Sequence, residues 1–230
     1  MRQEDIKKRL SAVPLFKELS DKELEPFIKI ALTRLYKQKM YVFMQEDPLD
    51  RVFFIHSGKI KIYKTDFSGK EQIVSVLEPG EMFPHAGFFR EGNFPAHAEV
   101  LEEANLIVLP IDKFEETLIA NPELCIKLFK VLGEKIVDLQ GRLEAQVLHN
   151  TFEQIVLLLI RLCQSNGEQA GNRYQLTTQF TNRELANMIG TSRETVSRTI
   201  NHLKKKNYIN LCKDGFYLID RDALEQELFY

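Results

Sequence analysis

Cysteine is scarce in this 230-residue chain, and its scarcity excludes several kinds of site. The three cysteines, Cys125, Cys163 and Cys212, lie far apart. They therefore form neither a disulfide framework nor a C-x-x-C pair for metal or redox chemistry. Because a free cysteine mostly behaves as a small hydrophobic residue, we expect incidental thiols in a reduced cytoplasm.

Long apolar runs are also absent. No stretch approaches the roughly 20 apolar residues that span a bilayer. The chain begins with five residues that lack the apolar core of a signal peptide. We therefore expect neither a membrane-spanning nor a secreted protein. A content of 44% hydrophobic and 28% charged residues excludes wholesale disorder, and the length favours two domains over one.

A large charge of one sign is missing as well, since the net charge is only −2. The distribution is uneven, however, because nine basic residues stand against three acidic ones between residues 161 and 213. Such a local excess is a candidate surface for the phosphates of a nucleic acid. Its basic members are Arg161, Arg173, Arg183, Arg193, Arg198, Lys204, Lys205, Lys206 and Lys213.

The first 110 residues predict a sheet preceded by small helices. Ser20 and Glu23 form a capping-box pattern at the start of a helix whose apolar pattern extends to Leu32. From residue 41 to about 110, short β-rich runs alternate with turns, and turn glycines recur every eleven residues. These features favour an antiparallel sandwich, jelly roll or barrel.

A long helix is predicted from Asn121 onward, because apolar residues there follow one another in steps of three and four. Such a stripe could pack on the sheet of its own chain. The length of the stripe favours a dimer seam instead, as do Gly133 and Gly141, which permit close approach of two backbones. The predicted seam comprises Leu128, Leu132, Ile136, Leu139, Leu143 and Val147.

A hinge and domain boundary are predicted at Asn150 and Thr151, where capping residues precede a new apolar helix. A polar loop is predicted after that helix, over residues 165–172. The predicted organisation is a roll with its N-terminal helices over 1–110, a long-helix region over 111–149 and a further domain over 150–230.

Two helices that meet at Gly190 form the most specific motif in the chain. Thr181 and Glu184 open the first helix with a capping box, and residues 191–194 form a second capping box. Ala186 is small at the point where the helices cross. This spacing predicts a helix-turn-helix whose second helix enters the major groove of DNA. An ordinary pair of packed helices is the alternative.

The leading turns of the second helix bear side chains suited to contacting bases. Arginine can donate to guanine O6 and N7, glutamate can accept from cytosine N4, and serine is permissive. We predict base contacts by Arg193, Glu194, Ser197 and Arg198. Hydroxyl and ammonium groups contact phosphates. Contacts to the DNA backbone are predicted for Thr181, Thr191, Ser192, Lys204, Lys205, Lys206 and Lys213.

After this motif, residues 208–211 and 216–219 predict a β-hairpin wing. With these motifs, the chain resembles the CRP/FNR family of bacterial transcription regulators over nearly its full length. Residues 15–110 resemble the family's cyclic-nucleotide-binding-type β-roll, 111–149 its dimerisation helix and 150–230 its winged helix. Residues 191–198, TSRETVSR, are a specific match to the family's recognition helix.

The resemblance implies an α+β fold with an antiparallel, jelly-roll-like sensor domain, a dimerisation helix and a winged helix-turn-helix. It implies a cytoplasmic homodimer that binds double-stranded DNA, has no catalytic role and contacts RNA polymerase if it is an activator. Arg193 is the type found in the family's cyclic AMP receptor branch, whereas Ser197 is the type of the FNR branch. We therefore expect a palindrome with half-sites near TGTGA or TTGAT, roughly 34 Å apart.

The sensing half departs from the family's cyclic AMP pattern. Family members that bind cyclic AMP have a Gly-Glu pair for the ribose and an Arg-Ser pair for the phosphate. Here residues 84–85 are Pro-His and residues 95–96 are Pro-Ala, and proline offers a phosphate neither an N–H nor a charge. Leu139 and Gln140 replace a Thr-Ser pair on the long helix. Cyclic AMP is therefore not expected as the ligand.

Other effectors are considered on the same residues. An iron–sulfur cluster needs about four clustered thiolates, so none is expected. His85 and His97 could be ordinary surface or core residues, ligands of haem or a metal, or a pH sensor. The nearby phenylalanines could host an apolar effector or fill the vacated space. The candidate effector pocket comprises Gly80, Glu81, Phe83, His85, Phe94, His97, Leu139 and Gln140.

Two further functions stay open at this point. A constitutive DNA-binding protein, with the roll as a mere scaffold, shares every feature except a ligand. A cupin-type metalloenzyme would need an H-x-H pair and further ligands. That alternative is disfavoured because no H-x-H occurs, and His85 and His97 lie twelve residues apart.

Overall fold

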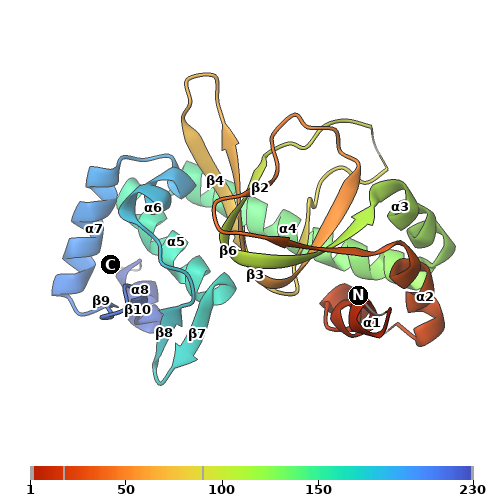
Figure 1. Cartoon of the computed structure of the whole chain (residues 1–230). Helices are drawn as coiled ribbons and strands as arrows, with labels where there is room; N and C mark the ends of the chain where they lie inside the picture. The colour runs from red at the N-terminus through yellow and green to blue at the C-terminus, as the bar shows by residue number, and fades with distance from the viewer. Residues whose placement is uncertain (1–2, 18, 90, 229–230) are drawn as a thin grey trace. The chain divides into compact units, whose positions relative to one another are not determined.

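The computed structural model describes residues 3–17, 19–89 and 91–228, and the chain divides into two compact units (Figure 1). The first, the roll unit, ends at Ile136, and the second, the helix-turn-helix unit, begins at Val137. The boundary falls inside α4 (Pro122–Leu148), which is a single helix. The predicted division at residues 110 and 149 stays a prediction. No described helix has the length and hydropathy needed to cross a membrane.

The roll unit is an antiparallel sheet flanked by helices. Its strands follow the order β1-β6-β3-β4, with β2 paired to β6 and β5 to β3. This arrangement confirms the predicted antiparallel roll. The elements are α1 (Gln3–Ser11), the 3-10 helix η1 (Pro14–Phe16), α2 (Asp21–Ile30), β1 (Leu32–Tyr36), β2 (Tyr41–Phe43), β3 (Arg51–Thr65), β4 (Glu71–Leu77), β5 (Met82–Phe83), β6 (His97–Pro110) and α3 (Ile111–Ala120).

The helix that begins after Ser20 is shorter than predicted. Its capping box is present, since the Ser20 N–H donates to Glu23 Oε2 at 2.7 Å. The helix ends at Ile30, however, and Leu32 begins β1, where it pairs with Val108 of β6. The apolar pattern to Leu32 was therefore interpreted wrongly. A local pattern does not reveal that a distant strand captures this segment.

Phenyl rings bind the helices to one face of the sheet. Phe16 of η1 lies 4.9 Å from both Phe27 of α2 and Phe54 of β3, measured between ring centroids. Phe114 of α3 lies 5.8 Å from Phe54. All four rings are fully buried, and aromatic side chains contribute large apolar areas to a core. These contacts fix the helices against β3, the longest strand.

The helix-turn-helix unit contains a four-stranded antiparallel sheet of order β7-β8-β10-β9 and five helical segments, counting the end of α4 and only the described residues. The β9–β10 hairpin confirms the predicted wing. The elements after α4 are α5 (Thr151–Ser165), β7 (Gly167–Ala170), β8 (Arg173–Leu176), α6 (Asn182–Ile189), α7 (Arg193–Lys205), β9 (Ile209–Leu211), β10 (Tyr217–Ile219) and α8 (Arg221–Glu227).

The polar stretch predicted as a loop contains a strand. Residues 167–170 form β7 and pair with β8 from Gly167–Leu176 to Ala170–Arg173. Gly171, with φ of +67°, lies in the turn between them. The loop prediction over 165–172 is therefore wrong for β7. The pairing of β8 with β10 extends the sheet and gives this polar hairpin a place in it.

Candidate DNA interface and sensor region

The first helix of the predicted motif is fixed at both ends. Thr181 Oγ1 accepts from the Glu184 N–H at 3.2 Å, and Glu184 Oε2 accepts from the Thr181 N–H at 2.8 Å. This is the predicted capping box. Gly190 ends the helix with φ of +87°, a conformation that favours glycine. The turn between α6 and α7 is thus encoded by residues inside the motif itself.

The second helix begins differently from the prediction. Ser192 is its N-cap, and Ser192 Oγ accepts from the Thr195 N–H at 3.1 Å. The second capping box predicted over residues 191–194 is therefore wrong. The Thr191 N–H instead donates to the Ala186 carbonyl at 3.2 Å, so Thr191 completes the end of α6. Both hydroxyl residues still lie at the leading end of α7.

The two faces of α7 differ in chemistry. Val196, Ile200 and Leu203 are at most 2% exposed and hold the helix in the core. The residues predicted to contact bases lie on the first turns of α7. Of these four, Arg193, Glu194 and Arg198 are exposed, and Ser197 is half-buried.

Glu194 is held in its charged form. Backbone hydrogen bonding, a hydrogen bond with Ser192 and the neighbouring arginines hold the pKa of Glu194 below its usual range. An ionised carboxylate is only an acceptor, which suits the amino group of cytosine. The Arg198 guanidinium donates to Thr195 Oγ1 at 3.4 Å and otherwise extends from the exposed part of the helix. The first turns of α7 therefore present donors and an acceptor together.

The basic residues between 161 and 213 differ in exposure and in their partners. Arg161 of α5 is half-buried, and burial together with nearby Arg142 lowers the pKa of Arg161 to about 10. The Arg173 guanidinium donates to the Asn207 carbonyl at 2.9 Å. Lys206 forms an ion pair with Glu227 at 2.6 Å. Partial burial argues against a phosphate-facing role for Arg161 and Arg173, whereas Lys206 is exposed and its contact with the DNA backbone stays a prediction.

The remaining lysines differ in their exposure and in their contacts. Lys205 and Lys213 are exposed, and neither forms an ion pair with any residue that the structure describes. Lys204 is half-buried, with its ammonium 5.6 Å from the centroid of the Tyr217 ring. The pair between Lys206 and Glu227 was missed because Glu227 belongs to α8, a short C-terminal helix without a strong sequence pattern.

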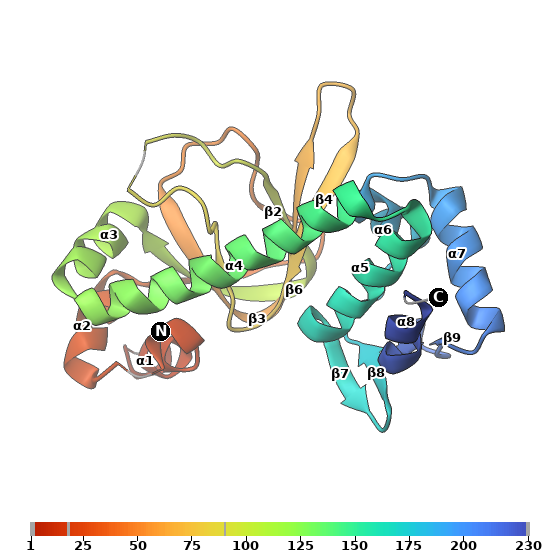
Figure 2. The same cartoon turned by 180° about the vertical axis from the view of Figure 1, so that it is seen from behind.

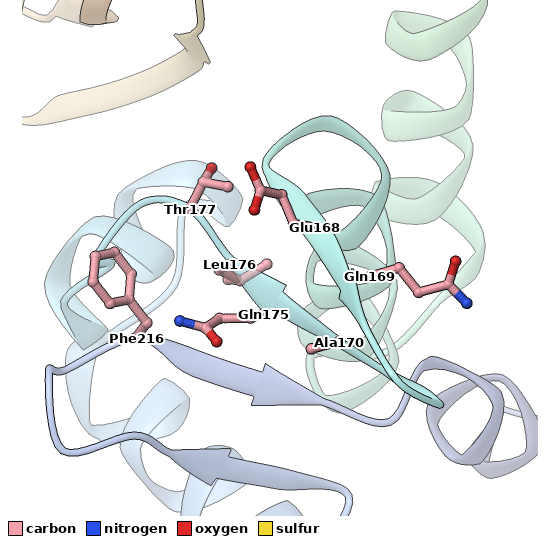
Figure 3. A pocket seen from close by; sticks show the side chains of 7 residues that line it. All are labelled: Glu168, Gln169, Ala170, Gln175, Leu176, Thr177 and Phe216. Carbon is pink, nitrogen blue, oxygen red and sulfur yellow. The ribbon is translucent and has the colours of Figure 1, made fainter.

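A cavity of about 200 Å³ lies on the helix-turn-helix unit beside the β7–β8 hairpin (Figure 3). Figure 3 shows the Gln175 amide directed toward the Phe216 ring, with Glu168 and Thr177 beside each other. The lining residues are Glu168, Gln169, Ala170, Gln175, Leu176, Thr177 and Phe216. A carboxylate repels phosphate, so we do not count this cavity as part of the DNA-facing surface.

Two residues of the predicted effector pocket are core residues. Phe83 and Phe94 are 1% and 2% exposed. The Phe94 ring stacks on Phe43 with centroids 3.7 Å apart, and the Phe83 ring stacks on Phe53 at 5.1 Å. In this structure the two rings therefore fill the interior of the roll.

Glu81 and His85 lie beside α4. The Lys135 ammonium pairs with Glu81 Oε1 at 2.8 Å. Burial lowers the pKa of His85 to about 4, and the positive charge of Lys135 acts in the same direction. The imidazole is therefore uncharged at neutral pH. Gly80, in the turn before Glu81, has φ of +93°. The structure thus brings Glu81 and His85 to Lys135 of the long helix, with Gly80 immediately before Glu81 in the chain.

His97 has a different environment from His85. His97 Nδ1 accepts from the Gln45 N–H at 3.1 Å, and its ring centroid lies 4.9 Å from that of Tyr63. The Tyr63 and Tyr41 hydroxyls are 2.9 Å apart. Among the described residues, no group of three or more His, Cys, Asp or Glu could hold a metal ion. Leu139 and Gln140 belong to the other unit, and their part in a pocket stays a prediction.

The predicted dimer seam divides into buried and exposed members. Leu128 is 2% exposed and belongs to the core of the roll unit, and Leu132 packs against the same core. The assignment of Leu128 to the seam is wrong, because the first turns of α4 cover the roll unit's own core, whereas that of half-buried Leu132 stays a prediction. The other predicted members, Ile136, Leu139, Leu143 and Val147, are 53–71% exposed.

Comparisons with known proteins agree with this architecture. Residues 33–121 match the family described as cyclic nucleotide-binding domain, and residues 153–227 match the Crp-like helix-turn-helix domain. The chain is 26% identical over 217 residues to the cyclic AMP receptor protein of Thermus thermophilus, covering 94% of this chain and 97% of the relative. It is also 26% identical over 222 residues to the anaerobic regulatory protein of Bacillus subtilis, covering 95% and 93%.

Solved structures show the same fold. A mutant of CooA from Carboxydothermus hydrogenoformans matches with a TM-score of 0.75 and 20% identity, covering 94% of each chain. At this level of identity the likeness concerns the arrangement of the elements alone.

Proposed function

The chain belongs to the CRP/FNR family of bacterial transcription regulators, and on that premise we propose that it is a homodimer that binds a specific palindromic DNA site. The observation that supports this most strongly is the first part of α7. Arg193, Glu194 and Arg198 are exposed there, whereas the opposite face of the same helix is buried. The N-terminal residues of a recognition helix are those that contact base edges.

The proposed site has half-sites near TGTGA or TTGAT. Arg193 and Arg198 would donate to guanines, Glu194 would accept from a cytosine amino group, and Ser197 would add a permissive contact. The two α7 helices of a symmetric dimer would place the half-sites about one helical turn, roughly 34 Å, apart. Selection of bound sequences from a random duplex library tests this proposal. We expect an inverted repeat, and a selected pool without one would contradict it.

Contacts to the DNA backbone would position α7. Hydroxyls of Thr181, Thr191 and Ser192 lie at the leading ends of the two helices, where phosphate contacts are common. Lys205 and Lys213 would neutralise phosphates more strongly than Lys206, whose ammonium is paired with Glu227. The affinity for any duplex should therefore fall as the salt concentration rises.

The signal that controls DNA binding is proposed to be something other than cyclic AMP. Proline and histidine at 84–85, and proline and alanine at 95–96, do not fit the nucleotide, because they offer no guanidinium to its phosphate. Ala96 is moreover only 4% exposed. A relative named for cyclic AMP does not alter this inference. Calorimetric titration with cyclic AMP should give no binding heat, and saturable binding would contradict the proposal.

Haem and other ligands are weaker proposals for the same region. His85 lies near Lys135, whereas His97 lies against Gln45 and Tyr63, so we do not propose that they share one metal or haem. A bound haem would therefore have either His85 or His97 as its axial ligand, but not both. Adding haem to the purified protein tests this version, since a bound haem gives a Soret absorption band. We expect no iron–sulfur cluster, because such a cluster needs about four clustered thiolates, and Cys125, Cys163 and Cys212 lie far apart in the sequence.

A constitutive regulator is the second candidate. It is favoured by the stacked rings of Phe43 and Phe94, which give the interior of the roll a tightly packed apolar filling. In that case the roll would be a scaffold for the dimer and DNA binding would need no effector. We propose no enzymatic role. We propose that the protein is located in the cytoplasm. If it activates transcription, we propose that it also contacts RNA polymerase.

A further inference from the structure

The wing of the helix-turn-helix unit contains a tight turn between its two strands. The chain passes from α7 directly into β9, the first strand of the wing (Figure 2). Residues 212–216, here called the wing turn, connect β9 to β10. The Cys212 N–H donates to the Phe216 carbonyl at 2.8 Å, and the Gly215 N–H donates to the Cys212 carbonyl at 3.0 Å. These bonds close the wing turn on itself, but they do not fix it against the rest of the unit.

The side chain of Gln179 supplies a contact from outside the wing. Gln179 lies between β8 and α6, and its Nε2 donates to the Asp214 carbonyl at 2.7 Å, across 35 positions of the chain. Gly215 packs on the same amide, since a Cβ added to this glycine would lie 3.4 Å from Gln179 Nε2. The Gln179 amide is therefore both bonded to the wing turn and packed against it.

A second contact joins the wing to the first residue of α6. The hydroxyl of Tyr217, at the start of β10, donates to Asn182 Oδ1 at 3.2 Å, and Tyr217 is only 5% exposed. Gln179 and Asn182 lie on either side of Thr181, the N-cap of α6. Because the two contacts come from both sides of Thr181, they hold the wing turn and the start of α6 as one surface.

This surface bears two groups proposed to contact DNA phosphates, the Thr181 hydroxyl and the Lys213 ammonium, and both residues are exposed. Lys213 immediately precedes Asp214, whose carbonyl accepts from the Gln179 amide. A lysine on a loose turn would have to be ordered when DNA binds, and that ordering weakens binding. A turn that is fixed in advance avoids this loss. Glutamine suits the position, because its amide donates to a carbonyl and has no charge that would attract or repel a phosphate.

We propose that Gln179 is a positioning residue for DNA binding, which holds the wing turn so that the Lys213 ammonium meets a phosphate of the duplex that α7 contacts. This inference rests on the proposed function and adds to it, since it assigns a role to a residue that itself needs no contact with DNA. The Asp214 carbonyl is the group through which Gln179 acts on Lys213.

Replacement of the amide tests the proposal in the full-length protein. Gln179→Met keeps the length of the side chain but removes the donor. Fluorescence anisotropy on the selected inverted repeat and on a scrambled duplex should show binding about three- to tenfold weaker on both, because the affected contact is to a phosphate. The salt slope should fall by up to about 1, the value of one phosphate contact. Binding equal to that of the wild type would overturn the proposal.

Gln169→Met is the matched control. Gln169 Nε2 also donates to the carbonyl of a turn residue, Gly171, at 3.4 Å, but that turn belongs to the β7–β8 hairpin, which contains no lysine. This variant should keep the affinity and the salt slope of the wild type. Equal losses for Gln179→Met and Gln169→Met would overturn a specific role of Gln179.

A double substitution tests whether Gln179 acts through Lys213. In a Lys213→Ala background, Gln179→Met should cause no further loss of affinity and no further change of the salt slope, because the ammonium that it positions is gone. A merely structural role would give additive losses, since destabilisation of the fold does not depend on the Lys213 charge. Additive losses would therefore overturn the proposed route.

Hydrogen exchange without DNA separates this inference from the proposed function. Gln179→Met should speed the exchange of the Cys212 and Gly215 amide protons by about threefold or more, because the wing turn opens more often, whereas Gln169→Met should not. Faster exchange with unchanged DNA binding would overturn the role of Gln179 in DNA binding and leave the proposed function intact. Unchanged exchange in Gln179→Met would overturn the tether itself. A wild-type protein that binds neither duplex would overturn the proposed function.

Discussion

The two units place their informative side chains differently. In the helix-turn-helix unit, Arg193, Glu194 and Arg198 are exposed on a helix fixed by local caps. In the roll unit, Phe83 and Phe94 of the candidate pocket are parts of the core, and Glu81, His85 and His97 are half-buried. A surface that contacts DNA can be recognised from short motifs. A sensing site depends on how distant segments fill a shared interior.

The largest expected effect concerns the aromatic core of the roll. Phe54→Ala removes a fully buried ring that packs on Phe16 and Phe114. The loss of buried area and the resulting cavity should lower the free energy of unfolding by about 3–5 kcal/mol. Urea unfolding of the full-length protein measures the change. Phe67→Ala is the matched control, because that ring is fully exposed, and equal effects of the two variants would contradict the description of the core.

Acid should weaken the roll unit through His85, whose pKa burial lowers to about 4. In the unfolded chain a histidine has a pKa near 6.5, so the unfolded state takes up the proton first as the pH falls. Stability should therefore be lost between about pH 6.5 and pH 4, by at most roughly 3 kcal/mol. His85→Gln should flatten this dependence in urea unfolding measured across the same pH range. An unchanged slope would show that His85 is not buried in its neutral form.

In the helix-turn-helix unit, two substitutions on α7 distinguish a contact with a base from a contact with a phosphate. Arg198→Ala should weaken binding to the matched duplex by about 1–3 kcal/mol and relax base preference, because a base contact is lost. Lys205→Ala should weaken matched and mismatched duplexes alike and reduce the salt slope by about 1. Fluorescence anisotropy at several salt concentrations distinguishes them. Equal losses on both duplexes for Arg198→Ala would contradict its assignment.

The smallest expected effect concerns the turn of the motif. Gly190 has φ of +87°, so Gly190→Ala should destabilise the helix-turn-helix unit by about 1 kcal/mol. Gly141→Ala is the matched control within α4, where an added Cβ meets nothing. It should stabilise that helix by up to about 1 kcal/mol. Thermal unfolding measures both, and a neutral Gly190→Ala would count against a strained turn at this position.

Several local features could be predicted from the sequence, but a short separation along the chain did not by itself make a feature predictable. The capping box at Thr181, the turn at Gly190 and the wing hairpin all depend on neighbours within a few residues, and each was predicted correctly. The start of β1 at Leu32 depends on pairing with β6, far along the chain, and was missed. The β7–β8 hairpin and the N-terminus of α7 are local features that were also predicted wrongly.

At the candidate DNA interface, one feature follows from the local sequence pattern and another depends on a contact with a distant segment. The exposed face of α7 was predictable, because helix periodicity fixes which residues face the core. The pairing of Lys206 with Glu227 was not, since it joins α7 to a helix near the end of the chain. In the predicted seam of α4, Leu128 and Leu132 pack on the roll unit's own core, whereas Ile136, Leu139, Leu143 and Val147 are exposed. Sequence alone does not distinguish an apolar residue that packs on its own core from one that awaits a partner.

The central claim is that α7 of a homodimer reads a palindromic site. The most direct test is fluorescence anisotropy of the full-length protein on the selected inverted repeat and on a scrambled duplex of the same composition, at one fixed salt concentration. The account predicts at least 1,000-fold tighter binding to the inverted repeat, on the order of the usual specificity ratio. Equal affinity for the two duplexes would contradict it.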